Sequence, residues 1–77
     1  MGYKSLPSLK SKQVVKAFYR AGFLYDRQKG SHLVLINKNL GARVVIPVHP
    51  GATIKKPLLK GIIEDSKIPI EKFLELL

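Results

Sequence analysis

The chain lacks cysteine altogether and has only five acidic residues among its 77 positions. Without cysteine it forms neither disulfides nor thiolate metal sites. No apolar run approaches the roughly 20 residues that a membrane-spanning helix needs, and residues 1–12 lack the apolar core of a signal peptide. These absences lead us to expect a cytoplasmic protein with no membrane attachment.

Positive charge is what the chain has in excess. Fourteen Lys and Arg residues give it a formal net charge of +9. Residues 1–63 carry twelve of them against a single acid, Asp26, for a net +11, whereas residues 64–77 carry two basic and four acidic residues, for a net −2. A basic body of this kind favours nucleic acid as the partner over an anionic membrane surface. An apolar content of 45% is too high for a disordered basic tail.

The first half of the chain contains one clear helix signal. Residues 1–10 are expected to be an extended lead-in, and Ser11 is expected to cap a helix that Gly22 closes in a left-handed conformation. An apolar stripe at helical spacing lies beside a basic face on this helix. The basic face consists of Lys12, Lys16 and Arg20.

A second helix is expected to begin near Lys56, with Pro57 in its first turn. Residues 68–69, Ile-Pro, break it, and a last short helix is expected over residues 70–77. The start of the second helix is suited to phosphate, because a helix N-terminus carries partial positive charge. Three lysines cluster there, Lys55, Lys56 and Lys60.

Between the helices, alternating residues predict three strands, at 23–28, 31–37 and 43–48, joined by turns. The middle strand is apolar on both faces, so we expect it at the centre of the sheet. The order α-β-β-β-α predicts an α+β fold, with both helices on one face of a three-stranded antiparallel sheet. That order is the order of the double-stranded RNA-binding domain, and we predict a single domain over residues 1–77. The open face of the sheet must then be basic or covered by a partner.

Few side chains could carry chemistry. Asp26 stands alone in the basic body, which argues against a paired-carboxylate site, and no ligand spacing supports a metal site. We therefore expect no metal and no cofactor. The remaining candidates are His32, at the start of the middle strand, and His49, in a Pro-Gly loop where a turn or a supporting hydrogen bond explains it.

Metal-free RNA cleavage needs few catalytic groups from the protein, because the 2′-hydroxyl of the substrate is the nucleophile. A histidine can move the protons, and Lys, Arg and backbone N–H groups can offset the phosphate charge. From spacing alone, His32 is more often a half-buried polar residue than a catalyst. A non-catalytic RNA-binding module and a small protein that binds an acidic partner therefore stay open as alternatives.

Several short motifs occur together along the chain. Ala21-Gly22-Phe23 is followed by Arg27-Gln28-Lys29-Gly30-Ser31-His32 and, one hairpin later, by Val45-Ile46-Pro47-Val48-His49. With Lys55-Lys56-Pro57 and its helix, these motifs resemble the HicA family of toxin–antitoxin ribonucleases. The similarity covers nearly the whole chain, from about residue 8 to residue 77.

This resemblance implies a double-stranded-RNA-binding-domain-like fold, cleavage of mRNA and neutralisation by a HicB-type antitoxin. The histidine of the Gly-Ser-His triplet is the family's catalytic residue, so that role carries over to His32. Gly30 and Ser31 match the same motif without a chemical role, and His49 matches a recurrent family position. The sequence departs from the commonest family pattern in the loop at 50–54 and at 65–67, Asp-Ser-Lys, where many members have a glycine or an Ala-Gly pair.

The basic residues are expected to hold the RNA through its phosphates. The candidates are Lys12, Lys16, Arg20, Arg27, Lys29, Lys55, Lys56 and Lys60. The sequence thus predicts the toxin of a type II toxin–antitoxin system, an endoribonuclease whose substrate is mRNA and whose partner is an antitoxin.

Overall fold

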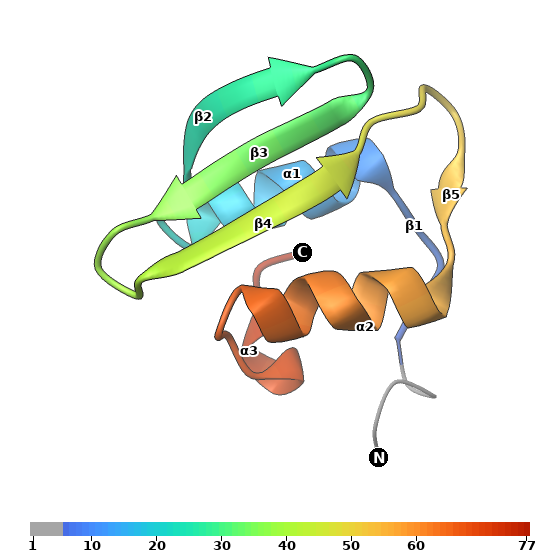
Figure 1. Ribbon diagram of the computed structural model, residues 1–77. Helices are drawn as coiled ribbons and strands as arrows, with labels where there is room; N and C mark the ends of the chain where they lie inside the picture. Colours follow the sequence, from blue (N-terminus) through green and yellow to red (C-terminus); the bar gives the residue numbers. More distant parts are fainter. Residues whose placement is uncertain (1–5) are drawn as a thin grey trace.

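Three antiparallel strands form the main sheet of the computed structural model, which describes residues 6–77 (Figure 1). Two helices cover one face of this sheet, and a short pair of strands and a third helix complete the fold. The elements in order are β1 (Leu9–Lys10), α1 (Ser11–Arg20), β2 (Leu24–Lys29), β3 (His32–Asn37), β4 (Ala42–Pro47), β5 (Thr53–Ile54), α2 (Lys56–Asp65) and α3 (Ile70–Glu75). The predicted α+β class and the α-β-β-β-α order are confirmed.

The strand order is β2-β3-β4, so β3 is central, as its two apolar faces predicted. The observed strands begin and end within one residue of the predicted bounds. In β3, Leu33 pairs with Ile46 and Leu35 pairs with Val44. All four side chains are buried, because they face the helices. A bulge between Tyr25 and Arg27 interrupts the pairing of β2 with β3.

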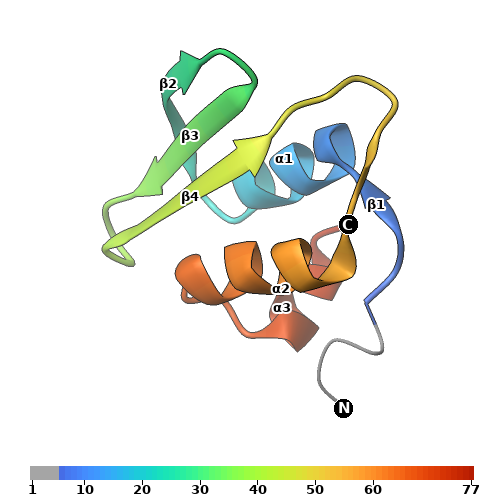
Figure 2. The ribbon, with the colours of Figure 1, turned by 45° about the vertical axis from the view of Figure 1, so that its right-hand side comes forward.

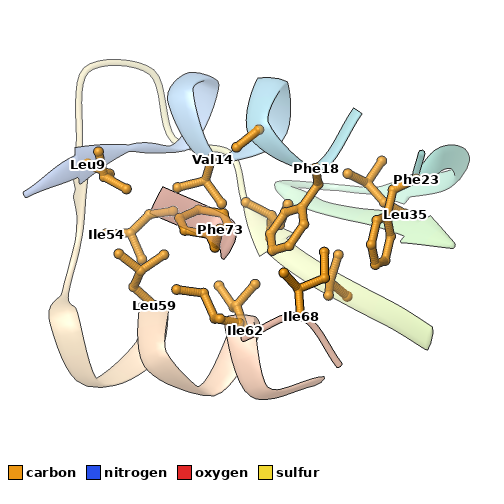
Figure 3. Close-up of a cluster of buried hydrophobic side chains, with 14 of the residues drawn as sticks. Leu9, Val14, Phe18, Phe23, Leu35, Ile54, Leu59, Ile62, Ile68 and Phe73 are labelled. Carbon is orange, nitrogen blue, oxygen red and sulfur yellow. The ribbon is translucent and has the colours of Figure 1, made fainter. Parts of the chain in front are cut away.

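The hydrophobic core lies between the sheet and the helices (Figure 3). Its centre is an aromatic cluster in which the Phe18 ring centroid lies 5.1 Å from that of Phe23 and 5.1 Å from that of Phe73. All three rings are fully buried. The cluster joins α1, the residue just before β2, and α3, so the C-terminal segment is part of the same core as the basic body.

A two-stranded pair that sequence reasoning missed joins β1 to β5, with Leu9 opposite Ile54. Both side chains are buried in the core. Strands of two residues have no alternation to detect, and their pairing is set by where α1 and α2 begin. Of the lead-in expected over residues 1–10, residues 1–5 lie outside the described part of the chain.

The start of α1 differs from the prediction. Lys10, not Ser11, is the N-cap, and its backbone N–H donates to Oε1 of Gln13 over 3.0 Å. Ser11 is the first helical residue, and it is buried. A glutamine three residues after the cap can satisfy the cap's N–H whatever the cap residue is, and this is why the helix begins one residue earlier than predicted. The left-handed Gly22 after the helix is confirmed, with φ 93°.

The second helix begins at Lys56 with Pro57 in its first turn, as predicted. It ends at Asp65, before Pro69 could break it. Ser66 caps the end, and Lys67 follows with φ 63°, the left-handed conformation that commonly ends helices.

Candidate functional site

His32 lies at one end of the molecule. The turn between β2 and β3, the loop over residues 48–52 and the start of α1 lie at this end, and β5 leads from the loop to the start of α2 (Figures 1 and 2). The strands bring the turn and the loop together, since His32 pairs with Pro47 and the backbone N–H of Val48 donates to the carbonyl of Ser31 over 2.7 Å. We call this region the His32 end.

The side chain of His32 is exposed, and it begins β3 with Lys29 opposite it on one side and Pro47 on the other. Gly30 turns the chain just before it with φ 59°, a conformation that glycine adopts at no steric cost. The Nε2 of Gln28 donates to the Gly30 carbonyl over 3.1 Å and closes the turn. Within residues 6–77 nothing hydrogen-bonds to the imidazole, so both ring nitrogens are open to a substrate.

Two shallow pockets flank the loop at residues 48–52. One, of about 370 Å³, lies against α1 and includes Lys12, Lys16 and Val48. The other, of about 250 Å³, lies against the start of α2 and includes His49, Lys55 and Pro47, the neighbour of His32 across the sheet. The structure thus places the basic side of α1 and the basic start of α2 on the two sides of one loop.

Several residues that the sequence grouped with these are positioned differently. Arg20 lies at the far end of α1, where its Nη1 donates to the carbonyl of Leu76 over 2.7 Å. The Nε of Arg27 lies 3.1 Å from Oδ2 of Asp26, and the Nζ of Lys60 lies 3.6 Å from Oε2 of Glu64.

The remaining two lysines belong to the His32 end. Lys29 lies in the turn beside His32, and Lys56 is exposed in the first turn of α2. Arg20 is therefore the member of the predicted set that lies at the opposite end of the molecule.

The open face of the sheet carries His32 and is not uniformly basic. Its centre is apolar, with Val34 only 8% exposed but Val45 38% and Leu24 68% exposed. Cross-strand partners share a face, so Arg27 lies beside Val34 and Arg43 lies beside Ile36. Sequence reasoning did not select Arg43, although its register with the central strand puts it on the same face as His32.

The described residues hold no cluster of three or more His, Asp or Glu side chains placed to bind a metal ion. Over residues 6–77, every helix is too short or too polar to cross a bilayer.

Comparison with known proteins identifies the family. A sequence model described as the HicA toxin of bacterial toxin–antitoxin systems matches residues 11–68, which is more than half of the chain. A search of curated proteins finds no match. The matched segment runs from the start of α1 through α2 and includes His32 with every lysine of the His32 end. The chain therefore belongs to the HicA toxin family.

Proposed function

We propose that this HicA-family toxin is a metal-independent endoribonuclease that cleaves mRNA in the cytoplasm, with His32 as its general acid or base. The observation that carries the proposal is the position of His32. It is an exposed imidazole with no hydrogen-bond partner within residues 6–77. Lys29 lies opposite it in the sheet, and further lysines lie on α1 and at the start of α2.

The reaction follows from what an imidazole can do beside a phosphodiester. A general base takes the proton from the 2′-hydroxyl, and the 2′-oxygen attacks the adjacent phosphorus. The bond from phosphorus to the 5′-oxygen breaks, and that oxygen takes up a proton. The products are a 2′,3′-cyclic phosphate and a free 5′-hydroxyl. His32 serves as base in the first proton transfer or as acid in the second.

The lysines of the His32 end support the same reaction. Lys12 and Lys16 lie on one side of the loop and Lys55 lies on the other. Lys29 lies opposite His32 in the sheet, and Lys56 is in the first turn of α2. They can bind the phosphates that flank the scissile bond, and the N-terminus of α2 adds backbone N–H groups to the same surface. An extended RNA strand can therefore be held across His32 without a deep cleft.

The test compares His32→Ala with His49→Ala, the matched control that removes the other exposed histidine. Cleavage of a labelled RNA is measured at equal concentrations of folded protein. We expect His32→Ala to lower the rate about 10²–10⁴-fold, the usual contribution of general acid–base catalysis, and His49→Ala to lower it far less. Equal rates for wild type and His32→Ala would refute the assignment.

A second candidate function is supported by the order of the elements. The α-β-β-β-α order and the basic surface also suit a double-stranded RNA-binding module that holds RNA without cutting it. The same experiment separates the two, because such a module would bind RNA and leave it intact in both variants.

Membership of a toxin family implies an antitoxin partner. We infer a HicB-type antitoxin that covers His32, because the sheet face around that residue offers an apolar centre with a basic rim. Leu24 and Val45 are exposed on this face beside Arg27 and Arg43, with Val34 and Ile36 of the central strand between the two arginines. An acidic partner would associate quickly with this surface and exclude RNA from it.

A further inference from the structure

A pocket of about 440 Å³ lies at the end of the molecule opposite His32. It forms where the end of α1, the turn between β3 and β4, the loop between α2 and α3, and α3 itself meet. Its lining is mainly aliphatic, from Ala21, Leu40, Ile68, Pro69 and Leu76. Neither catalysis nor RNA binding, as proposed above, uses it.

One wall of this pocket is held in place by Asn37, which is buried at the end of β3. Its Nδ2 donates to the carbonyl of Ala21 over 3.3 Å, and its Oδ1 accepts the backbone N–H of Leu40 over 3.1 Å. A single side chain thus ties the end of α1 to the β3–β4 turn.

The opposite wall is held by Ser66, which is fully buried. Its hydroxyl donates to the carbonyl of Ile63 and accepts the N–H of Ile68 over 3.1 Å. The bond from Arg20 to the carbonyl of Leu76 ties α1 to the segment after α3. The pocket is therefore built on fixed backbone, which favours selective binding because little ordering is needed.

Three cations complete the lining, Arg20, Lys67 and Lys72. Lys67 is the one non-glycine residue of positive φ within residues 6–77. Its Nζ reaches the β3–β4 turn, where it would lie 3.6 Å from a Cβ placed on Gly41. The Nζ of Lys72 lies 3.9 Å from Oε1 of Glu75, and both side chains are more than 60% exposed, so this ion pair is readily exchanged.

We propose that this pocket binds an acidic segment of a partner protein. An aliphatic side chain of that segment fills the pocket, and carboxylates on either side of it pair with Lys67 and Lys72. The four acids of residues 64–77 lie outside the lining, so an acidic ligand meets none of these carboxylates in the pocket and exchanges with Glu75 for Lys72. No aromatic ring lines the pocket, whereas single-stranded RNA is usually held by stacking on such rings.

This site is distinct from the one that the toxin uses on RNA. His32 begins β3 and the pocket lies beyond the end of that strand, so the segment can stay bound while the His32 end is open. The site is a second anchor for an inhibitory partner. Only the identity of that partner as an antitoxin rests on the proposed function.

The test uses full-length ¹⁵N-labelled protein and a capped peptide, Glu-Glu-Leu-Glu-Glu, followed by amide chemical shifts. We expect shift changes centred on Ala21, Leu40 and Ile68. The control peptides Glu-Glu-Ser-Glu-Glu, without the aliphatic side chain, and Lys-Lys-Leu-Lys-Lys, with reversed charge, should leave these signals in place.

Two variants locate the binding. Leu40→Glu puts an acid on the half-exposed pocket border and should weaken the peptide at least about ten-fold through lost apolar contact and like-charge repulsion. Lys67→Gly removes one exposed ion pair and should weaken it by up to about five-fold. Lys38→Ala, which removes a nearby lysine outside the pocket, is the matched control and should bind as wild type does.

The proposal is overturned if the peptide shifts signals of the β2–β3 turn instead, if the control peptides shift the signals of Ala21, Leu40 and Ile68 as the acidic leucine peptide does, or if Leu40→Glu binds normally. A 2′-O-methyl oligouridylate, which the proposed nuclease cannot cleave, tests the other class of ligand. Shifts at Leu40 and Ile68 with this RNA would assign the pocket to nucleic acid and overturn the proposal. Peptide binding and RNA cleavage are measured separately on the wild type. A failure of this proposal is therefore distinguishable from a failure of the proposed nuclease function.

Discussion

The two ends of the molecule are constructed differently. At the His32 end, the turn at residues 29–32 and the loop at residues 48–52 are largely exposed, and backbone bonds with one glutamine side chain hold them. At the opposite end, the buried Asn37 and Ser66 side chains join separate elements. A long charged strand requires an open, lysine-bearing surface. A single aliphatic side chain requires walls that do not move.

The sharpest test of the His32 end uses the substrate. If the 2′-hydroxyl is the nucleophile, an RNA with one 2′-deoxynucleotide at the cleavage position should not be cut there at all. Cleavage of the unmodified RNA should persist in EDTA, and its products should end in a 2′,3′-cyclic phosphate. Gel analysis of end-labelled RNA checks all three. Activity lost in EDTA and restored by Mg²⁺ would indicate a metal-dependent mechanism instead.

The effect of salt on RNA affinity is expected to be the next largest. If six to ten phosphates are contacted, affinity should fall about 10³–10⁵-fold between 50 and 200 mM salt. Replacing Lys12, Lys16 and Lys55 by alanine should lower the salt slope, whereas replacing Lys67 and Lys72 should not. Fluorescence anisotropy with a non-cleavable RNA measures this. A flat salt response, or an equal effect of both sets, would remove the distinction between the two ends.

Substitutions at the opposite end should mainly change the free energy of unfolding. Ser66→Ala leaves the carbonyl of Ile63 and the N–H of Ile68 without their hydroxyl partner in a buried site. We expect a loss of about 1–3 kcal/mol in the free energy of unfolding, or about 4–8 °C in Tm per kcal/mol. Thermal unfolding followed by circular dichroism measures it, with the exposed Ser8→Ala as control. RNA cleavage below the transition should stay at the wild-type rate, and a large loss of activity would contradict the separation of the two ends.

The contrast also explains what the sequence could predict. The three strands, the two main helices and the central place of β3 followed from apolar periodicity, because long amphipathic segments record which face is buried. The pairing of β1 with β5 and the lysine cap of α1 did not, since each depends on two or three residues. His32 was selected through its motif. Its openness and its lysine neighbours come from tertiary packing.

The pocket at the opposite end left no sequence signal at all. Its lining combines residues from four segments, and aliphatic side chains such as Leu40 and Ile68 read as ordinary core or loop residues. Arg20 was grouped with Lys12 and Lys16 by helical spacing, yet it lies a full helix length from the His32 end. Helical spacing shows that residues share one face of a helix, but it does not show at which end of the molecule each residue lies.

The smallest expected effect concerns Lys67 and has an unusual sign. A left-handed conformation costs a non-glycine residue roughly 1–2 kcal/mol, and Lys67 has φ 63°. Glycine removes that cost, but its more flexible unfolded chain offsets about 0.4–1 kcal/mol of the gain. Lys67→Gly should therefore raise the free energy of unfolding by about 0.5–1 kcal/mol, or Tm by about 4 °C. Lys38→Gly is the matched control, because it removes the same charge where φ is not positive. It should not raise the free energy of unfolding. If Lys67→Gly instead lowers Tm as far as Lys38→Gly does, the backbone at Lys67 is unstrained. If it raises Tm while weakening the acidic peptide, the lysine is retained at this position for what it binds.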